Sequence, residues 1–217
     1  MGVPFHVIAT GSTGNAVIVN DFVLIDCGVS YKALEPYVRK LRLVLLTHIH
    51  GDHFRIPTIR NLAANRPKLR FAAPRWLTRP LVLAGVKPEN IDILEAGTMY
   101  AYGLCNVIPV MLYHDVPNFG YKIHFGGKKV FYATDTGNLN GITAKHYDLY
   151  LIEANYGQNE IQARIDEKKE SGEYIYERRV LEYHLSKEDC DNFIYKNIGP
   201  NSEYVYLHEH VGKEVPK

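Results

Sequence analysis

The sequence predicts an α+β fold in which two mixed β-sheets are flanked by helices, within a single domain spanning residues 1–217. Short apolar runs typical of strands come in groups, with segments of helical pattern between them. Of the 217 residues, 46% are hydrophobic, which is ample for one well-formed core. The chain contains neither a short-period repeat nor a low-complexity segment, so no repeat architecture is expected.

The first half is predicted to contain five strands and three helices. Asn20-Asp21 separates two apolar runs and is a plausible hairpin turn, and Gly85 is a suitable end for the third helix. The expected strands are Phe5–Thr10, Ala16–Asn20, Phe22–Cys27, Leu41–Leu46 and Leu69–Ala72, and the expected helices are 30–40, capped by Ser30, then Ile56–Arg66 and Arg75–Ala84.

The second half repeats the pattern with six strands and two helices. Gly126-Gly127 is typical of a tight hairpin turn, whereas residues 157–180 are charged, lack a clear apolar period and are expected to form a mostly exposed excursion. The expected strands are Met99–Tyr102, Asn106–Leu112, Phe119–Phe125, Lys129–Thr134, Leu149–Glu153 and Tyr204–Leu207, and the expected helices are Asn140–His146 and Ser186–Lys196.

Charge and cysteine content narrow the functional classes. The net charge of +1 predicts no strong overall attraction to polyanions, so any basic surface must be local. The densest basic interval runs from Arg60 to Arg79 and contains Trp76; a solvated helix face and a substrate-binding face are equally compatible with it. Three distant cysteines without a C-x-x-C motif indicate reduced, buried thiols and a cytoplasmic protein. No N-terminal segment resembles a signal peptide and no apolar run reaches ~18–20 residues, so neither export nor membrane spanning is expected.

The stretch from Thr47 to His53 reads T-H-x-H-x-D-H and directly follows an apolar run. Imidazole and carboxylate groups at this density suit Zn²⁺, Mn²⁺ or Fe²⁺. Because consecutive residues cannot all surround one tetrahedral ion, two ions are expected. His48 and His50 are two residues apart, which puts both on one side of an extended segment. A surface loop or an expression tag is the alternative, but a tag would be terminal and monotonous.

Further ligand-type residues follow predicted strands, where loops can form a cleft on a rigid support. His114, Asp135 and His208 each come after an apolar run, with His210 as the competitor for the place of His208. Asp26 also ends an apolar run and is expected to accept hydrogen bonds from loop amides or from a histidine. His184 precedes Ser186, a good helix cap, so it is either a solvent-facing residue at a helix start or a proton donor or phosphate contact in the cleft.

Together these residues resemble the metallo-β-lactamase superfamily of binuclear hydrolases over nearly the whole chain. The resemblance implies a four-layer αβ/βα sandwich. The segments 10–15, 24–28, 151–155 and 184–188 narrow it to the YycJ/WalJ exonuclease-like branch. This chain has Tyr156 where the branch usually has histidine, and His208-Glu209-His210 where it usually has His-Leu-Ser.

The resemblance also implies roles for individual residues. One metal ion would be held by His48, His50 and His114, and the other by Asp52, His53 and His208, with Asp135 as the bridge. A metal-bound hydroxide would attack phosphorus; Asp52 would orient it or take its proton, and His184 would stabilise the developing charge or protonate the leaving group. Ser12, Thr13 and Asn15 would donate hydrogen bonds to a phosphate, and Asp26 would support the ligands from behind.

The function expected from this resemblance is a phosphodiesterase or nuclease that acts on DNA with two divalent ions, zinc or manganese, with iron as a further option. A thioester or lactone hydrolase of the glyoxalase II type and a small cyclic-nucleotide phosphodiesterase are the alternatives, and the first of these would not need the His184-Leu185-Ser186 element. The expected partner is a nucleic acid, with DNA favoured over RNA. No membrane partner is expected, and a homo-oligomer is left open.

Overall fold

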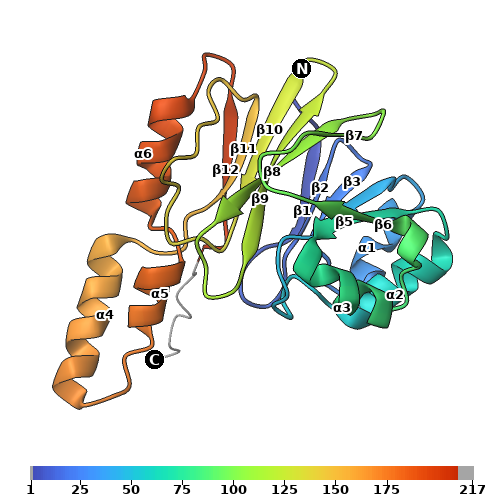
Figure 1. Ribbon diagram of the computed structural model, residues 1–217. Helices are drawn as coiled ribbons and strands as arrows, with labels where there is room; N and C mark the ends of the chain where they lie inside the picture. Colours follow the sequence, from blue (N-terminus) through green and yellow to red (C-terminus); the bar gives the residue numbers. More distant parts are fainter. Residues whose placement is uncertain (1, 210–217) are drawn as a thin grey trace.

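In the computed structural model, which describes residues 2–209, two β-sheets lie face to face between layers of helices (Figure 1). The first sheet has the strand order β1-β2-β3-β4-β5-β6, and the second has the order β12-β11-β10-β9-β8-β7. Helices α1, α2 and α3 pack on the outer face of the first sheet, and α6 packs on the outer face of the second. The predicted α+β sandwich of two mixed sheets is confirmed.

The first sheet begins with an antiparallel meander and continues with parallel strands. Asn20 and Asp21 have positive φ angles of 51° and 64° and lie in the turn between the paired residues Val19 and Val23, so the predicted turn is confirmed. The strands are β1 Phe5–Ala9, β2 Ala16–Val19, β3 Val23–Ile25, β4 Leu43–Leu45, β5 Arg70–Pro74 and β6 Ile91–Leu94, and the helices are α1 Tyr31–Val38, α2 Ile56–Asn65 and α3 Thr78–Leu83, with short 3₁₀ turns η1 Arg75–Leu77 and η2 Pro88–Asn90.

The second sheet follows the same plan, with antiparallel strands β7 to β10 followed by parallel β10, β11 and β12. Gly126 and Gly127 both have positive φ angles, which confirms the second predicted hairpin turn. The strands are β7 Tyr100–Ala101, β8 Asn106–Leu112, β9 Asn118–Phe125, β10 Lys128–Ala133, β11 Leu149–Glu153 and β12 Glu203–Leu207, and the helices are α4 Gln158–Ser171, α5 Glu177–Tyr183 and α6 Lys187–Asn197.

The alternation of side chains along each strand creates three apolar layers. In β4, Leu43 and Leu45 enter the core between the two sheets, whereas Val44 faces helices α1 to α3. In β10, Val130 and Tyr132 enter the same central core, and the alternate residues Phe131 and Ala133 face α6. Strands buried on both faces explain why the apolar runs of the sequence are nearly continuous. The three cysteines are free and buried, as predicted.

The structure differs from the sequence-based expectations in three places. Residues 140–146 do not form a helix, because Gly141 and His146 have left-handed φ angles of 75° and 55°. The segment 157–180 is mostly exposed, as predicted, but it contains all of α4 and the first part of α5. The helical pattern of α4 is weak in the sequence because this helix buries only Ile161 and Ile165. Strand β6 was not predicted, since it is a short, half-buried edge strand. Among the described residues, no helix has the length and apolarity needed to cross a membrane.

The two parallel regions bring strand ends from both sheets to one edge of the molecule. The chain leaves β4 into the histidine-rich loop, while β10, β11 and β12 are followed by Asp135, Asn155 and His208 at neighbouring positions. Strand β8 points the same way as β10, because β9 runs antiparallel to both, so His114 reaches the same edge. The hydrogen bond from the Phe119 amide to the Thr47 carbonyl, at 3.3 Å, joins the two sheets there.

Candidate metal centre

The loop of residues 47–53, here called the metal loop, is held against the strand end at 26–28 by backbone contacts. The amide of Asn15 donates to the Asp52 carbonyl at 2.6 Å, and the amide of Cys27 donates to the His53 carbonyl at 2.8 Å. A Cβ atom on Gly28 would lie 1.6 Å from the Asp52 carbonyl oxygen. Residue 28 must therefore be glycine for the loop to approach this closely.

Asp26 lies beneath the metal loop and is fully buried. Its carboxylate accepts hydrogen bonds from the Thr47 amide at 2.9 Å, from the Thr47 hydroxyl at 2.9 Å and from His53 Nδ1 at 2.7 Å. Because Asp26 accepts the Nδ1 proton, Nε2 is the nitrogen of His53 that faces the cluster. This is the geometry expected of a residue that orients a metal ligand from behind. Asp26 also has a φ angle of 61°, a strained conformation typical of functional sites.

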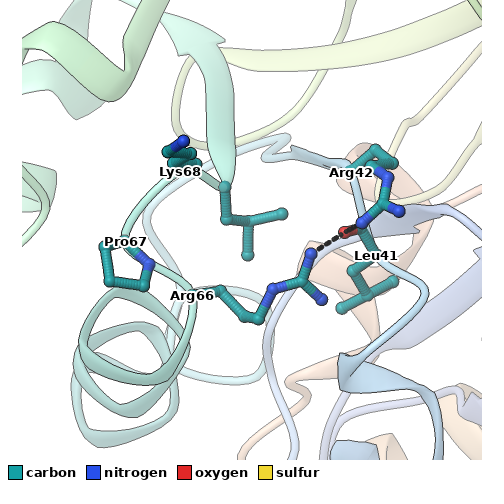
Figure 2. Close-up of a pocket in the computed structure, with 6 residues that line it drawn as sticks. Leu41, Arg42, Arg66, Pro67 and Lys68 are labelled. Carbon is teal, nitrogen blue, oxygen red and sulfur yellow. Dashed lines mark hydrogen bonds between the residues drawn. The ribbon is translucent and has the colours of Figure 1, made fainter.

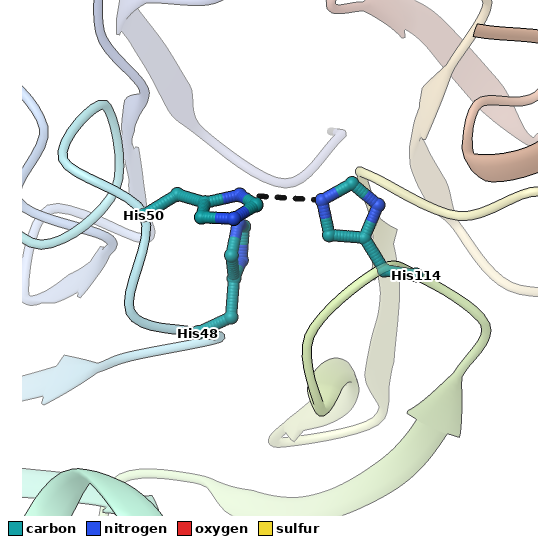
Figure 3. A group of neighbouring side chains, drawn as sticks. All are labelled: His48, His50 and His114. Carbon is teal, nitrogen blue, oxygen red and sulfur yellow. Dashed lines mark hydrogen bonds between the residues drawn. The ribbon is translucent and has the colours of Figure 1, made fainter. Parts of the chain in front are cut away.

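Three imidazoles form the first group of candidate ligands, from His48, His50 and His114 (Figure 3). One nitrogen of each lies within 4.8 Å of those of the other two. The Thr47 hydroxyl, which donates to Asp26, accepts from His48 Nδ1 at 2.9 Å, and the Tyr183 carbonyl accepts from His114 Nδ1 at 3.1 Å. Both histidines therefore turn Nε2 toward the group. Burial lowers the pKa of His48 and of His114, which favours the neutral imidazole that metals bind.

The second group contains Asp135, Glu153, His184 and His208, with one ligand-type atom of each within 4.8 Å of the others. His208 Nδ1 lies 3.0 Å from both Asp135 Oδ1 and Glu153 Oε1, and His184 Nδ1 lies 2.6 Å from Glu153 Oε1. Burial opposes protonation of His208, but the two carboxylates raise its pKa to about 10. Burial likewise opposes protonation of His184, and Glu153 outweighs it, so the pKa of His184 is raised.

Asp135 connects the two groups. Its Oδ2 atom lies 2.7 Å from His53 Nε2, and Asp135, His48 and His53 form a third set of candidate ligands. Burial would raise the pKa of the Asp135 carboxyl, but His53 and His208 outweigh it and hold this pKa well below its usual range. Asp135 has a φ angle of 55° and His208 one of 53°, so both strained backbones aim their side chains at the same point.

The chemistry of this cluster fits a divalent metal. His48 Nε2 and Asp135 Oδ2 are buried and have no hydrogen-bond partner among the described residues; the 2.7 Å approach of Asp135 Oδ2 to His53 lacks hydrogen-bond geometry. An unsatisfied buried polar atom costs about 1–3 kcal/mol. A cation placed among these atoms would satisfy both, and nitrogen with carboxylate oxygen is the ligand set of zinc, manganese and iron sites.

The second set implied by the resemblance, Asp52 with His53 and His208, is not brought together in this form. Asp52 Oδ2 lies 3.6 Å from His53 Nε2, and the Asp52 side chain is 24% exposed, but Asp52 belongs to none of the candidate groups. Glu153 lies in the cluster instead. Glu153 could have been found in the sequence by the same pattern as Asp135 and His208, because Glu153 also stands at the end of an apolar strand. His210, the alternative to His208, lies outside the described residues.

A pocket of about 910 Å³ opens over the cluster. Asp52, His184 and His208 line it, and so do Ser12 and Thr13. These five placements are compatible with the roles that the sequence predicts.

Asn15 does not line this pocket, contrary to its predicted role as a phosphate contact. It is 1% exposed, and its side chain accepts from the Gly11 amide at 2.9 Å and donates to the Gly11 carbonyl at 3.0 Å. Its Nδ2 atom also lies 2.8 Å from His53 Nε2. Asn15 therefore fixes the loop of residues 11–14 to the metal loop, while Ser12 and Thr13 form the exposed part of that loop.

A second hollow, of about 510 Å³, lies at the start of β4 and β5, away from the metal loop (Figure 2). Arg66 closes it by donating to the Leu41 carbonyl at 2.9 Å and to the Val38 carbonyl. In the same basic interval of the sequence, Arg70 pairs with Asp92. These two arginines hold loops and strands together, which indicates a structural role for them and not a role in substrate binding.

Comparison with known proteins gives consistent matches. The family described as "Beta-lactamase superfamily domain" matches residues 22–186. Exodeoxyribonuclease YycJ of Bacillus anthracis is 27% identical over 228 residues, covering 95% of this chain and 82% of the relative. The metallo-β-lactamase fold protein YhfI from Bacillus subtilis has a TM-score of 0.73 at 17% identity, covering 98% of this chain and 88% of its own. The short form of human tRNase Z has a TM-score of 0.63 at 17% identity, with 96% and 93% covered.

Proposed function

Because the chain belongs to the metallo-β-lactamase superfamily and is a metal-dependent hydrolase, we propose that it is a phosphodiesterase that cleaves nucleic acid, with DNA as the preferred substrate. The observation that carries this proposal is the His184–Glu153 pair on the wall of the metal pocket. A thioester hydrolase would not need it, because a thiolate is a far weaker base than a sugar alkoxide and leaves without a proton donor. The likeness to the exodeoxyribonuclease YycJ of Bacillus anthracis supports DNA.

We propose two divalent ions, zinc or manganese, with iron as an alternative. The first group, His48, His50 and His114, would hold one of them. Asp135 would bridge to the other, which His53 and His208 would hold together with Asp52 or Glu153. Such ions polarise a phosphoryl oxygen and make a water nucleophilic at neutral pH.

His184 is proposed to protonate the leaving oxygen. Its Nδ1 atom donates to Glu153 Oε1 at 2.6 Å, so the ring orientation is fixed and Nε2 remains available to the substrate. Glu153 is fully buried and also accepts from the Thr136 amide at 2.9 Å, which keeps its carboxylate in place. A proton donor held in this way contributes about 10²–10⁴-fold to the rate.

Asp52 is proposed to position the attacking water and to take its proton. It lines the pocket, and the 3.3 Å contact from Asn15 Nδ2 holds its Oδ2 beside His53. Ser12 and Thr13, on the opposite loop, would donate hydrogen bonds to the phosphate. The three buried thiols suit a protein that works in the cytoplasm, where thiols stay reduced.

A substrate panel tests the proposal. The purified protein, reconstituted with Mn²⁺ or Zn²⁺, is incubated with single- and double-stranded DNA labelled at either end, with RNA, with bis-p-nitrophenyl phosphate, with a cyclic nucleotide and with S-lactoylglutathione. We expect DNA to be degraded fastest. Opening of S-lactoylglutathione without any phosphodiester cleavage would overturn the proposal, and cleavage of the cyclic nucleotide alone would reassign the substrate.

A further inference from the structure

One wall of the metal pocket is built by the segment that joins α4 to α5 and by α5 itself. Tyr174, Tyr176 and Tyr183 line the pocket together with the ligand-type residues. Figure 1 shows α4 and α5 side by side below α6, projecting away from the sheets. The sequence predicts an exposed excursion here, and the structure makes that excursion part of the pocket.

Two of these tyrosines have little role in packing. Tyr174 is 80% exposed and Tyr176 is 41% exposed, although both line the pocket. Tyrosine rings in a nucleic-acid site offer faces on which bases stack, and each stacked base is worth about 5- to 100-fold in affinity. The pocket volume of about 910 Å³ is at the upper end for sites that enclose a small ligand.

Tyr176 is already held in place. The Lys168 ammonium lies 4.3 Å from the centre of its ring and pairs with the buried Glu177 at 2.6 Å. The lysine therefore covers part of the ring and restricts its motion, while the ring still lines the pocket. A ring positioned before the ligand arrives loses less conformational entropy on binding.

The α5 wall is tied to the metal cluster by several contacts. The Tyr183 carbonyl accepts from His114 Nδ1 at 3.1 Å, and Arg179 Nη2 donates to Asp115 Oδ2 at 2.7 Å. Asp115 Oδ1 in turn lies 3.2 Å from His114 Nε2. A Cβ atom on Gly137 would lie 2.1 Å from the Glu182 carbonyl oxygen, so the loop after Asp135 packs directly on α5. The tyrosines thus have a defined position relative to the cluster.

We propose that Tyr174 and Tyr176 form a stacking platform for an unpaired nucleobase of the substrate, next to the phosphate that the metal cluster receives. This inference rests on the proposed function and extends it. It makes the platform the element that distinguishes a nucleic acid from other phosphodiesters. It also predicts that cleavage requires a base outside a duplex, as in a single strand or a frayed end, because both ring faces of a paired base are stacked on neighbouring pairs.

Two oligomers of equal length test the platform, oligothymidylate and its abasic analogue with tetrahydrofuran in place of each nucleoside. We expect Tyr174→Ala and Tyr176→Ala each to raise KM for oligothymidylate about fivefold or more, with kcat and the KM for the abasic oligomer unchanged. Tyr174→Phe and Tyr176→Phe should behave as the wild type, because they keep the ring. Tyr195→Ala is the matched control, since Tyr195 is 85% exposed on α6 and does not line the pocket.

The possible outcomes distinguish failure of this inference from failure of the proposed function. Equal effects on both oligomers, or no effect on either, would overturn the platform while bis-p-nitrophenyl phosphate cleavage persists. If the wild type cleaves no phosphodiester, the proposed function fails, and the platform is decided by binding alone. In that case fluorescence anisotropy with phosphorothioate oligothymidylate and its abasic analogue, on wild-type and alanine variants, must show the same base-dependent loss of affinity of about fivefold or more.

Discussion

The two groups of candidate ligands are assembled in different ways. In the first group, His48 and His50 come from one loop after β4, and His114 is added from the end of β8. In the second group, each of the four residues comes from a different place, after β10, at the end of β11, before α6 and after β12. A short motif can create the first group, whereas the second exists only when three parallel strands align their carboxyl ends.

The groups also differ in charge. The first contains imidazoles alone, and burial lowers the pKa of His48 and His114. The second contains two carboxylates, which raise the pKa of His184 and of His208 against the effect of burial. The first group therefore offers neutral nitrogens, and the second is a network of ion pairs. Asp135 belongs to the second group and also forms the third set with His53 and with His48 of the first group.

The largest effect is expected from Asp135→Ala, which breaks the connection between the groups. It should reduce hydrolysis of bis-p-nitrophenyl phosphate by at least about 10⁴-fold, because a missing metal costs several kcal/mol of transition-state stabilisation. Zinc measured by mass spectrometry after reconstitution should fall by one equivalent or more. Wild-type metal content with near-wild-type turnover would show that Asp135 is not the bridge.

Alanine substitutions at His48 and His184 test whether His48 binds metal and His184 donates a proton. His184→Ala should lower phosphodiester turnover by about 10²–10⁴-fold, the usual contribution of a proton donor, and leave the metal content intact. His48→Ala should lose metal as well as turnover. Should His184→Ala also lose metal, His184 would be a ligand of the second group rather than a proton donor.

Asp26→Asn tests the support beneath the metal loop. Loss of the charged acceptor for His53 and Thr47 should weaken zinc binding about 10- to 100-fold, as measured by competition with a chelator. Asp92→Asn is the control, because Asp92 lies in β6 and pairs with Arg70 of β5. Loss of this ion pair should leave the zinc affinity unchanged. Equal zinc affinity in both variants would contradict the role given to Asp26.

Gly28→Ala tests the close approach of the metal loop. The added Cβ would collide with the Asp52 carbonyl, so the free energy of unfolding in urea should fall by about 1–3 kcal/mol. Gly51→Ala, in the same loop, is the control. Its Cβ would meet nothing within 4 Å and its φ is not in the left-handed region, and a change of less than about 0.5 kcal/mol is expected there.

Ser186→Ala should have the smallest effect. The Ser186 hydroxyl accepts from the Asp189 amide at 3.0 Å and caps α6, so its removal should lower the free energy of unfolding by about 1 kcal/mol. Ser30→Ala is a matched control, because Ser30 stands at the start of α1 without a capping hydrogen bond from its side chain. Equal loss in both variants would show that the cap contributes nothing.

Several features of the fold could be predicted because they depend on neighbouring residues. The apolar run before Thr47 predicts β4 and delivers the metal loop. Asn20-Asp21 and Gly126-Gly127 predict two hairpin turns. Ser186 predicts the start of α6. The errors occur where local pattern is weak, as in α4 and β6, or where a left-handed residue such as Gly141 stops a helix.

By itself, the sequence determined the fold class, the order of most elements and the compact set of histidines at 48–53. Only the tertiary structure decided that Glu153 enters the cluster, that Asn15 is a buried brace and that Tyr174 and Tyr176 reach the metal pocket. The physical reason is distance along the chain. Contacts such as His184 with Glu153 or Asn15 with His53 join residues that only the pairing of strands and the packing of the two sheets bring together.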